Sequence, residues 1–277
     1  MACDTMRGMG NAADLPRFIF CNHKVGTKLS TQLATLVAPL LGWKRKGVRG
    51  LVHRVEPGAD LVVFAHSLIG FDLAAMPHRG IRLVRDPRDV WLSGYLYHRH
   101  CREAWCLASP PDNPVEPILF PLVPYSQQHR PEAWKRDYLA ALGGRSYQDN
   151  LLALDREAGL AFEETRYAAW TLEAMADWRP APGTIDIRME DIAADFDGTM
   201  ARMFRHLGVP DAMIGPCVEA SRAADVARMD DAQLAANPHI HGRQLSKWRS
   251  MLTAAEVARF EARHGDAIRS LGYPLSS

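Results

Sequence analysis

Cysteine is scarce in this chain. Its 277 residues include five cysteines, at Cys3, Cys21, Cys101, Cys106 and Cys217. Such an odd and scattered set does not form the disulfide framework of a small secreted protein or the paired clusters of a zinc ribbon. Cys101 and Cys106 stand near His98 and His100, but no second Cys/His pair accompanies them, so we expect no metal site.

Long hydrophobic runs are also missing. The longest apolar stretch, residues 33–43, contains Thr35 and Pro39 and is too short to cross a bilayer. Residues 1–16 are glycine-rich, with two acidic residues and no apolar run of the kind that a secretory signal requires. We therefore expect a flexible leader over residues 1–16, no stable membrane insertion and a cytoplasmic location.

Neither sign of charge is in excess. The 33 Lys and Arg residues nearly balance the 32 Asp and Glu residues, which gives a net charge of +1. A protein that binds nucleic acid through bulk charge is therefore not expected. The chain is 47% hydrophobic and 23% charged, which is ordinary for a globular protein of a size that can form one α/β domain.

The residues around Gly26 have the pattern of an anion-binding turn. Residues 17–21 read as a buried strand, and residues 22–27 read as a tight turn that opens a helix ending near residue 38. Such a turn points backbone N–H groups and the positive end of a helix dipole at one spot, which suits a phosphate. The ATP-binding P-loop pattern is absent, because Cys21 and Thr27 stand where that pattern needs a glycine and a lysine.

A second segment, residues 81–93, has a similar organisation. Ile81, Leu83 and Val84 read as a buried strand, and Asp86-Pro87 marks the start of the following helix, with Asp86 as its N-cap. Arg85 at the strand end and Ser93 in the helix are placed to face one anion.

Together these segments resemble the cofactor site of the PAPS-dependent sulfotransferases, where PAPS is 3'-phosphoadenosine 5'-phosphosulfate. Residues 24–28 are similar to the family's loop for the 5'-phosphosulfate, and residues 85–93 are similar to its 3'-phosphate motif. Residues 184–191 and 247–253 resemble two later segments of the family in the same order. The resemblance covers about residues 17–274.

The resemblance implies an α/β fold, a single domain over residues 17–277 with a central parallel sheet flanked by helices, of the P-loop-like sulfotransferase type. The alternation of strands with helices favours the same architecture. Further strands are expected at residues 61–65 and 184–188, and further helices at 87–100, 195–207, 211–226 and 253–270. The basic residues 43–50 read as a solvated turn, with an acceptor-binding patch as the alternative.

The family motifs also imply which residues hold PAPS and its product PAP, adenosine 3',5'-bisphosphate. The lysine of the first loop places its ammonium on the leaving oxygen, and the arginine and serine of the second motif bind the 3'-phosphate. The cofactor residues carried over are Lys24, Val25, Gly26, Thr27, Lys28, Arg85, Ser93 and Arg243, with Lys247 and Arg249 as alternatives to Arg243. Leu29 stands where some members place a tryptophan against the adenine. Glu190 is expected to order the site.

A general base is expected to take the proton of the attacking hydroxyl. His66 ends the strand at residues 61–65, where cytosolic members of the family carry a histidine base, and a histidine is suited to this task near neutral pH. His23 and Glu56 are alternatives.

The acceptor pocket is expected within residues 109–178. Residues 109–125 are too rich in proline for a helix or an inner strand and form a long loop, followed by helices at 130–142 and 147–178. The sequence leaves the acceptor open among small molecules, lipids and carbohydrates, and leaves the oligomeric state open.

The sequence therefore predicts an enzyme that moves a sulfuryl group from PAPS to a hydroxyl or amine without a metal. Two alternatives stay open. One is a small-molecule kinase that uses ATP and Mg²⁺, and the other is a non-catalytic nucleotide-binding protein on the same fold.

Overall fold

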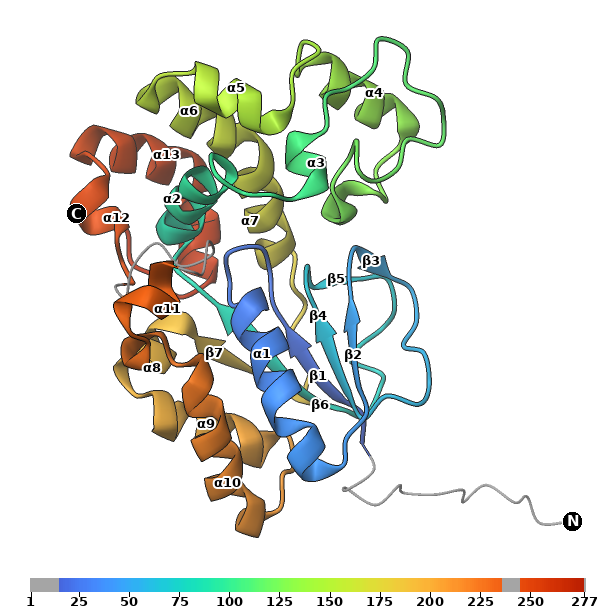
Figure 1. Cartoon of the computed structure of the whole chain (residues 1–277), viewed down its shortest axis with the longest axis vertical. Coiled ribbons are helices and arrows are strands. Elements are labelled where there is room, and N and C mark those ends of the chain that lie inside the picture. Colours follow the sequence, from blue (N-terminus) through green and yellow to red (C-terminus); the bar gives the residue numbers. More distant parts are fainter. Residues whose placement is uncertain (1–14, 236–244, 277) are drawn as a thin grey trace, which may run out of the picture.

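The computed structural model describes residues 15–235 and 245–276. A central sheet of five parallel strands runs in the order β2 (Arg45–Val48), β4 (Leu61–Phe64), β1 (Arg17–Phe20), β6 (Arg79–Val84) and β7 (Thr184–Arg188) (Figure 1). A two-stranded parallel sheet joins β3 (Leu51–Val52) to β5 (Leu68–Ile69). The predicted α/β fold with a parallel sheet flanked by helices is confirmed.

The described residues also form α-helices. In order they are α1 (Thr27–Val37), α2 (Pro87–His98), α3 (Ala104–Leu107), α4 (Glu132–Ala140), α5 (Tyr147–Ala153), α6 (Arg156–Glu163), α7 (Ala169–Ala176), α8 (Met189–Ala194), α9 (Phe196–His206), α10 (Asp211–Ser221), α11 (Asp231–Ala235), α12 (Trp248–Met251) and α13 (Ala254–Ser270). A π-helical turn, η4 (Glu164–Ala168), joins α6 to α7. The expected leader, residues 1–16, falls almost entirely outside the described residues.

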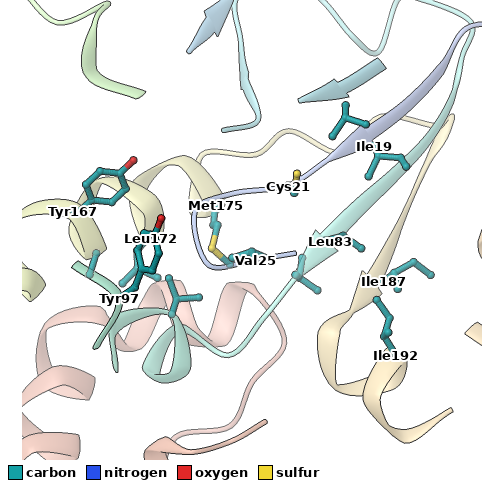
Figure 2. Packing of buried hydrophobic residues seen from close by; sticks show 14 of the residues in the cluster. Ile19, Cys21, Val25, Leu83, Tyr97, Tyr167, Leu172, Met175, Ile187 and Ile192 are labelled. Atoms are coloured by element: carbon teal, nitrogen blue, oxygen red, sulfur yellow. The ribbon is translucent and has the colours of Figure 1, made fainter. Parts of the chain in front are cut away.

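The central strands are buried on both faces, as parallel strands usually are. On one face Ile19, Val63 and Leu83 belong to a large hydrophobic cluster that includes side chains of α1 and α9. On the other face Phe18 and Phe64 form a smaller cluster, closed mainly by irregular segments. Figure 2 shows part of the large cluster, including residues of β1, β6, β7 and α7.

The strand order determines where a ligand can bind. The chain starts in the middle of the sheet with β1, adds β2 and β4 on one side, and then crosses to β6 on the other side. In open parallel sheets ligands bind beyond the carboxyl ends of the strands, where the strand order reverses. The segments after β1, β4 and β6 carry Lys24, His66 and Arg85, and in Figure 1 helices α2, α3 and α7 lie beyond these strand ends.

Two expectations about local structure were wrong. The basic stretch predicted as a solvated turn contains β2, an edge strand whose Arg45, Lys46 and Gly47 are exposed and therefore lack the apolar pattern of a strand. The helix predicted over 147–178 is interrupted at Leu154, which is extended, and Asp155 starts a new helix by accepting a hydrogen bond from Ala158 N at 2.8 Å.

Gly26 is required by the packing beneath the first loop. Its φ is +74°, and a Cβ at this position would lie 2.4 Å from Leu83 Cδ1 and 2.9 Å from Met189 Sδ. We expect Gly26→Ala to cost about 2 kcal/mol or more, because it adds a strained φ to overpacking of a closed core. Chemical denaturation measures this cost, and Gly42→Ala is the matched control, since Gly42 has φ +64° and open space around it. Equal losses in both variants would show that backbone strain alone matters.

Candidate functional site

Hydrogen bonds to its backbone carbonyl oxygens hold the loop between β1 and α1 in place. Val25 N donates to Asn22 O at 2.9 Å, and Thr27 Oγ1 donates to Asn22 O at 3.0 Å. Ser67 Oγ donates to Cys21 O at 2.8 Å, which fastens the loop to the end of β4. The loop is therefore preformed, and Lys24 has a positive φ of 59° within it.

The start of α1 is open to an anion. Gly26 is the N-cap residue, and among the described residues no side chain caps the helix. The first N–H groups of a helix have no partner inside the helix, and the dipole makes this end positive. Lys28 and Leu29 of this first turn line the adjacent cavity.

Lys24 is the most electrostatically perturbed cation of the site. Its Nζ lies 4.1 Å from the centre of the Tyr97 ring. Burial, and next the positive charge of Arg85, lower the pKa of Lys24 to about 7, while the Glu103 carboxylate acts in the opposite direction. The charge of this ammonium is therefore sensitive to any anion that binds beside it.

Arg85 joins the two predicted anion motifs. Its Nη1 donates to Lys24 O at 2.9 Å, so the end of β6 is attached directly to the first loop. Its Nη2 lies 3.9 Å from Asp89 Oδ2, and its buried Nε has no hydrogen-bond partner among the described residues. Ser93, two turns into α2, lines the same cavity as Arg85 and Lys24.

Asp89 holds the C-terminal segment rather than a close ion pair with Arg85. Its two carboxylate oxygens accept from Ser246 N at 2.6 Å and from Trp248 N at 3.1 Å. This contact places Lys247 on the wall of the cavity, where burial, followed by the charge of Arg85, lowers its pKa. Lys247, which the sequence offers as an alternative to Arg243, is therefore placed where it could bind an anion.

Glu190 lies beneath the second motif, as the sequence predicted for an ordering residue. Its carboxylate accepts from Asp86 N at 3.2 Å and from the Tyr273 hydroxyl at 2.8 Å. It therefore fixes the turn that carries Arg85 and does not line the cavity.

His66 lies on the cavity wall with one ring nitrogen already engaged. Gly50 N donates to His66 Nδ1 at 2.9 Å, so the proton of the neutral ring resides on Nε2. Burial, with a smaller contribution from Arg49, lowers the pKa of His66 to about 4. Above that pH the ring is neutral and offers an N–H donor.

These residues surround a cavity of about 820 Å³. The predicted residues on its wall are Lys24, Gly26, Thr27, Lys28, His66, Arg85 and Ser93. The cationic side chains that line it are Lys24, Lys28, Arg49, Arg85, Arg102 and Lys247, and the acidic ones are Glu103 and Asp225. Six cations against two acids suit a ligand with several negative charges.

Some predicted residues lie elsewhere. Val25 is fully buried, and its N–H is used within the loop, so it shapes the loop from beneath. Glu56 is exposed and pairs with Arg54 at 2.7 Å, outside the cavity lining. Arg243 falls outside the described residues. His23 does line the cavity, with its ring stacked on that of His98 at 4.8 Å.

The sequence prediction missed the acidic part of the wall and did not name the aromatic residues beside it. Glu103 stands between α2 and α3 and accepts from the Tyr97 hydroxyl at 2.7 Å and from Trp105 Nε1 at 2.5 Å. Phe120 and Tyr125, stacked at 4.4 Å, belong to the proline-rich segment and line the same cavity. The proline-rich segment had been predicted as part of the acceptor pocket, whereas Glu103 belongs to no recognisable motif.

The described parts of the chain contain neither a metal-type cluster of side chains nor a helix that could span a membrane. Across residues 15–235 and 245–276, no group of three His, Cys, Asp or Glu side chains is arranged to hold a metal ion. Among the helices of these residues, none has the length and apolar character needed to cross a bilayer.

No protein-family model matches this chain, and no curated protein matches it. Among solved structures, the mouse sulfotransferase SULT7A1 complexed with PAP has a similar backbone, with a TM-score of 0.45 and 14% sequence identity. The match covers 93% of this chain and 87% of that one. A likeness at this level says nothing about activity.

The pKa of Lys24 makes anion binding dependent on pH. A bound phosphate stabilises the charged ammonium and raises this pKa from about 7, so binding above pH 7 must take up a proton. We expect the affinity for adenosine 3',5'-bisphosphate to weaken between pH 7 and 9, by at most about tenfold per pH unit. Titration calorimetry in buffers of different ionisation enthalpy measures the uptake. Lys24→Met should flatten the dependence, and an unchanged slope in that variant would assign the proton to another group.

Proposed function

We propose that this chain is a PAPS-dependent sulfotransferase. It would transfer the sulfuryl group of PAPS to a hydroxyl or amine of a small-molecule, lipid or carbohydrate acceptor and release PAP. The observation that carries the proposal is the convergence of two phosphate-type sites, around Lys24 and around Arg85 and Ser93, on one strongly cationic cavity. A nucleotide with phosphates at both ends of its ribose needs two such sites.

The residues fit this nucleotide chemically. The buried Arg85 Nε lacks a partner among the described residues, which is costly unless an acceptor is supplied, and a guanidinium binds phosphate in a bidentate way. Ser93 adds a hydroxyl on the same wall, and Lys247 adds a second cation. We assign the 3'-phosphate to this group and the 5'-phosphosulfate to Lys24, Thr27, Lys28 and the open start of α1.

Transfer would proceed by in-line displacement. The acceptor oxygen or nitrogen forms a bond to sulfur while the bond from sulfur to the bridging phosphate oxygen breaks. As in phosphoryl transfer, the protein contributes mainly alignment and charge stabilisation. The Lys24 ammonium would stabilise the charge that develops on the leaving oxygen, and His66, the base that the sequence predicts, lies on the same wall.

The two alternatives make different demands on the cavity. A kinase that uses ATP needs carboxylates for Mg²⁺, whereas the acids of this wall are Glu103 and Asp225, and Asp225 is engaged with Ala227 N at 3.0 Å and Arg228 Nε at 2.9 Å. A non-catalytic nucleotide-binding protein would need the phosphate sites but not the perturbed lysine. The sulfotransferase proposal accounts both for the small number of carboxylates on the wall and for the lowered pKa of Lys24.

Ligand selectivity tests the proposal directly. We expect PAP at about 100 times its dissociation constant to stabilise the protein by about 2.7 kcal/mol in thermal denaturation, and ADP to do much less. Stabilisation by ATP–Mg²⁺ alone would favour the kinase alternative.

Arg85→Ala should weaken binding of the 3'-phosphate without affecting binding of the 5'-phosphate. We expect this variant to bind PAP roughly 10- to 100-fold more weakly while its affinity for ADP changes little, since ADP lacks the 3'-phosphate. Arg54→Ala is the control, because Arg54 is exposed outside the cavity. Equal weakening of PAP and ADP would place the 3'-phosphate elsewhere.

Lys24→Ala should separate binding from chemistry. We expect turnover at saturating PAPS to fall about 10²- to 10³-fold, as when a preorganised charge donor is removed from a transition state, while PAP still binds with the weakened affinity expected of the wild-type protein at high pH. Unchanged turnover would remove Lys24 from the mechanism.

A further inference from the structure

We propose that Glu103 is the general base of the transfer, accepting the proton of the acceptor hydroxyl. This inference rests on the proposed sulfotransferase function and names a residue of that same cavity. Three observations support it: the state of His66, the position of Glu103, and the engagement of the other acid on the wall.

His66 presents the wrong atom for a base. A base needs a free lone pair, and the Nδ1 lone pair of His66 accepts from Gly50 N at 2.9 Å. The remaining nitrogen of the neutral ring therefore carries a proton. In this arrangement His66 is suited to donate a hydrogen bond to the acceptor or the sulfuryl oxygens.

Glu103 presents a carboxylate to the cavity beside Lys24. Its two oxygens accept from the Tyr97 hydroxyl and Trp105 Nε1, which fixes the carboxylate plane and leaves lone pairs for one further hydrogen bond. The ring of Tyr97 in turn lies 4.1 Å from Lys24 Nζ. The Tyr97 side chain thus lies between Glu103, at its hydroxyl, and Lys24, at its ring, and both charged groups line the cavity in which the transfer would occur.

Three other titratable groups of the wall are less suited to the role. Asp225, the second acid of the wall, is engaged with Ala227 N and Arg228 Nε. Burial and the adjacent Glu103 raise the pKa of Tyr97 well above its ordinary value, so Tyr97 keeps its proton and remains a donor. Cys101, on the wall next to Glu103, is 3% exposed and interacts with Cys106.

The proton and the bonds balance in this scheme. The acceptor O–H bond breaks as its proton moves to Glu103, and the acceptor oxygen forms a bond to sulfur. The bond between sulfur and the bridging oxygen breaks, and the electron pair stays on PAP beside the Lys24 ammonium. Glu103 then returns the proton to solvent through the open side of the cavity.

A pair of acceptors that differ in acidity tests the assignment. 4-Nitrophenol ionises on its own near neutral pH and needs no base, whereas 4-nitrobenzyl alcohol does not ionise and needs one. We expect Glu103→Gln to slow transfer from PAPS to the alcohol by ~100-fold or more and transfer to the phenol by less than ~10-fold. Glu103→Asp, which keeps a carboxylate, should recover part of the rate with the alcohol.

Controls distinguish a catalytic effect of Glu103 from a loss of folding and from a failure of the proposed function. PAP affinity and thermal stability of each variant show whether the site is intact, and Glu157→Gln, at an exposed glutamate paired with Arg259, is the matched substitution. His66→Gln tests the rival base. If wild-type protein does not bind PAP, the sulfotransferase proposal itself fails.

The remaining outcomes decide on Glu103. A selective loss with the alcohol in Glu103→Gln supports the inference. The same selective loss in His66→Gln, with Glu103→Gln at the wild-type rate, overturns it. A wild-type protein that binds PAP but transfers to neither acceptor, and does not hydrolyse PAPS with water as acceptor, also overturns it and favours a non-catalytic protein.

Discussion

The arrangement of the site depends on the hydrogen bonds and the ion pair that the Asp86 carboxylate makes. It caps α2 through Arg88 N at 3.0 Å, pairs with Arg88 Nη2 at 2.7 Å and accepts from Trp248 Nε1 at 3.1 Å. Arg88 is almost fully buried and also binds Glu261 of α13 at 2.6 Å. Charges buried in this way are stable only when each has its partners, so the end of β6, the start of α2 and the C-terminal segment keep a single relative position.

This position concentrates positive charge in one cavity. With Arg85 tied to Lys24 O and the C-terminal segment tied to Asp89, the cations of three separate segments face the same space. Their burial, and next the repulsion from Arg85, explain why the pKa values of Lys24 and Lys247 are both lowered. A polyanionic ligand relieves this repulsion, so the electrostatic cost built into the protein favours binding of the ligand that we propose.

The aromatic side of the cavity has a different character. Tyr97, Trp105, Phe120 and Tyr125 supply aromatic wall, and Glu103 lies among them. His66 lies there too, but the Gly50 N–H determines which of its nitrogens keeps the proton. The chemical role of a histidine at a strand end therefore depends on a backbone contact 16 residues earlier in the chain.

The sequence by itself determined the parallel α/β fold, the turn around Gly26, the Asp86 cap and three of the cations that line the cavity, Lys24, Lys28 and Arg85. These features are local, because the patterns that specify a strand, a helix cap or a glycine turn each lie within a short stretch of the sequence. Only the tertiary structure decided that Lys247 joins the wall, that Glu103 faces it, that Val25 and Glu56 do not, and that His66 offers an N–H. Each of these depends on contacts between segments distant in the chain, which no local pattern specifies. The polar edge strand β2 shows the same limit, because its exposed residues pair with β4 without an apolar pattern of their own.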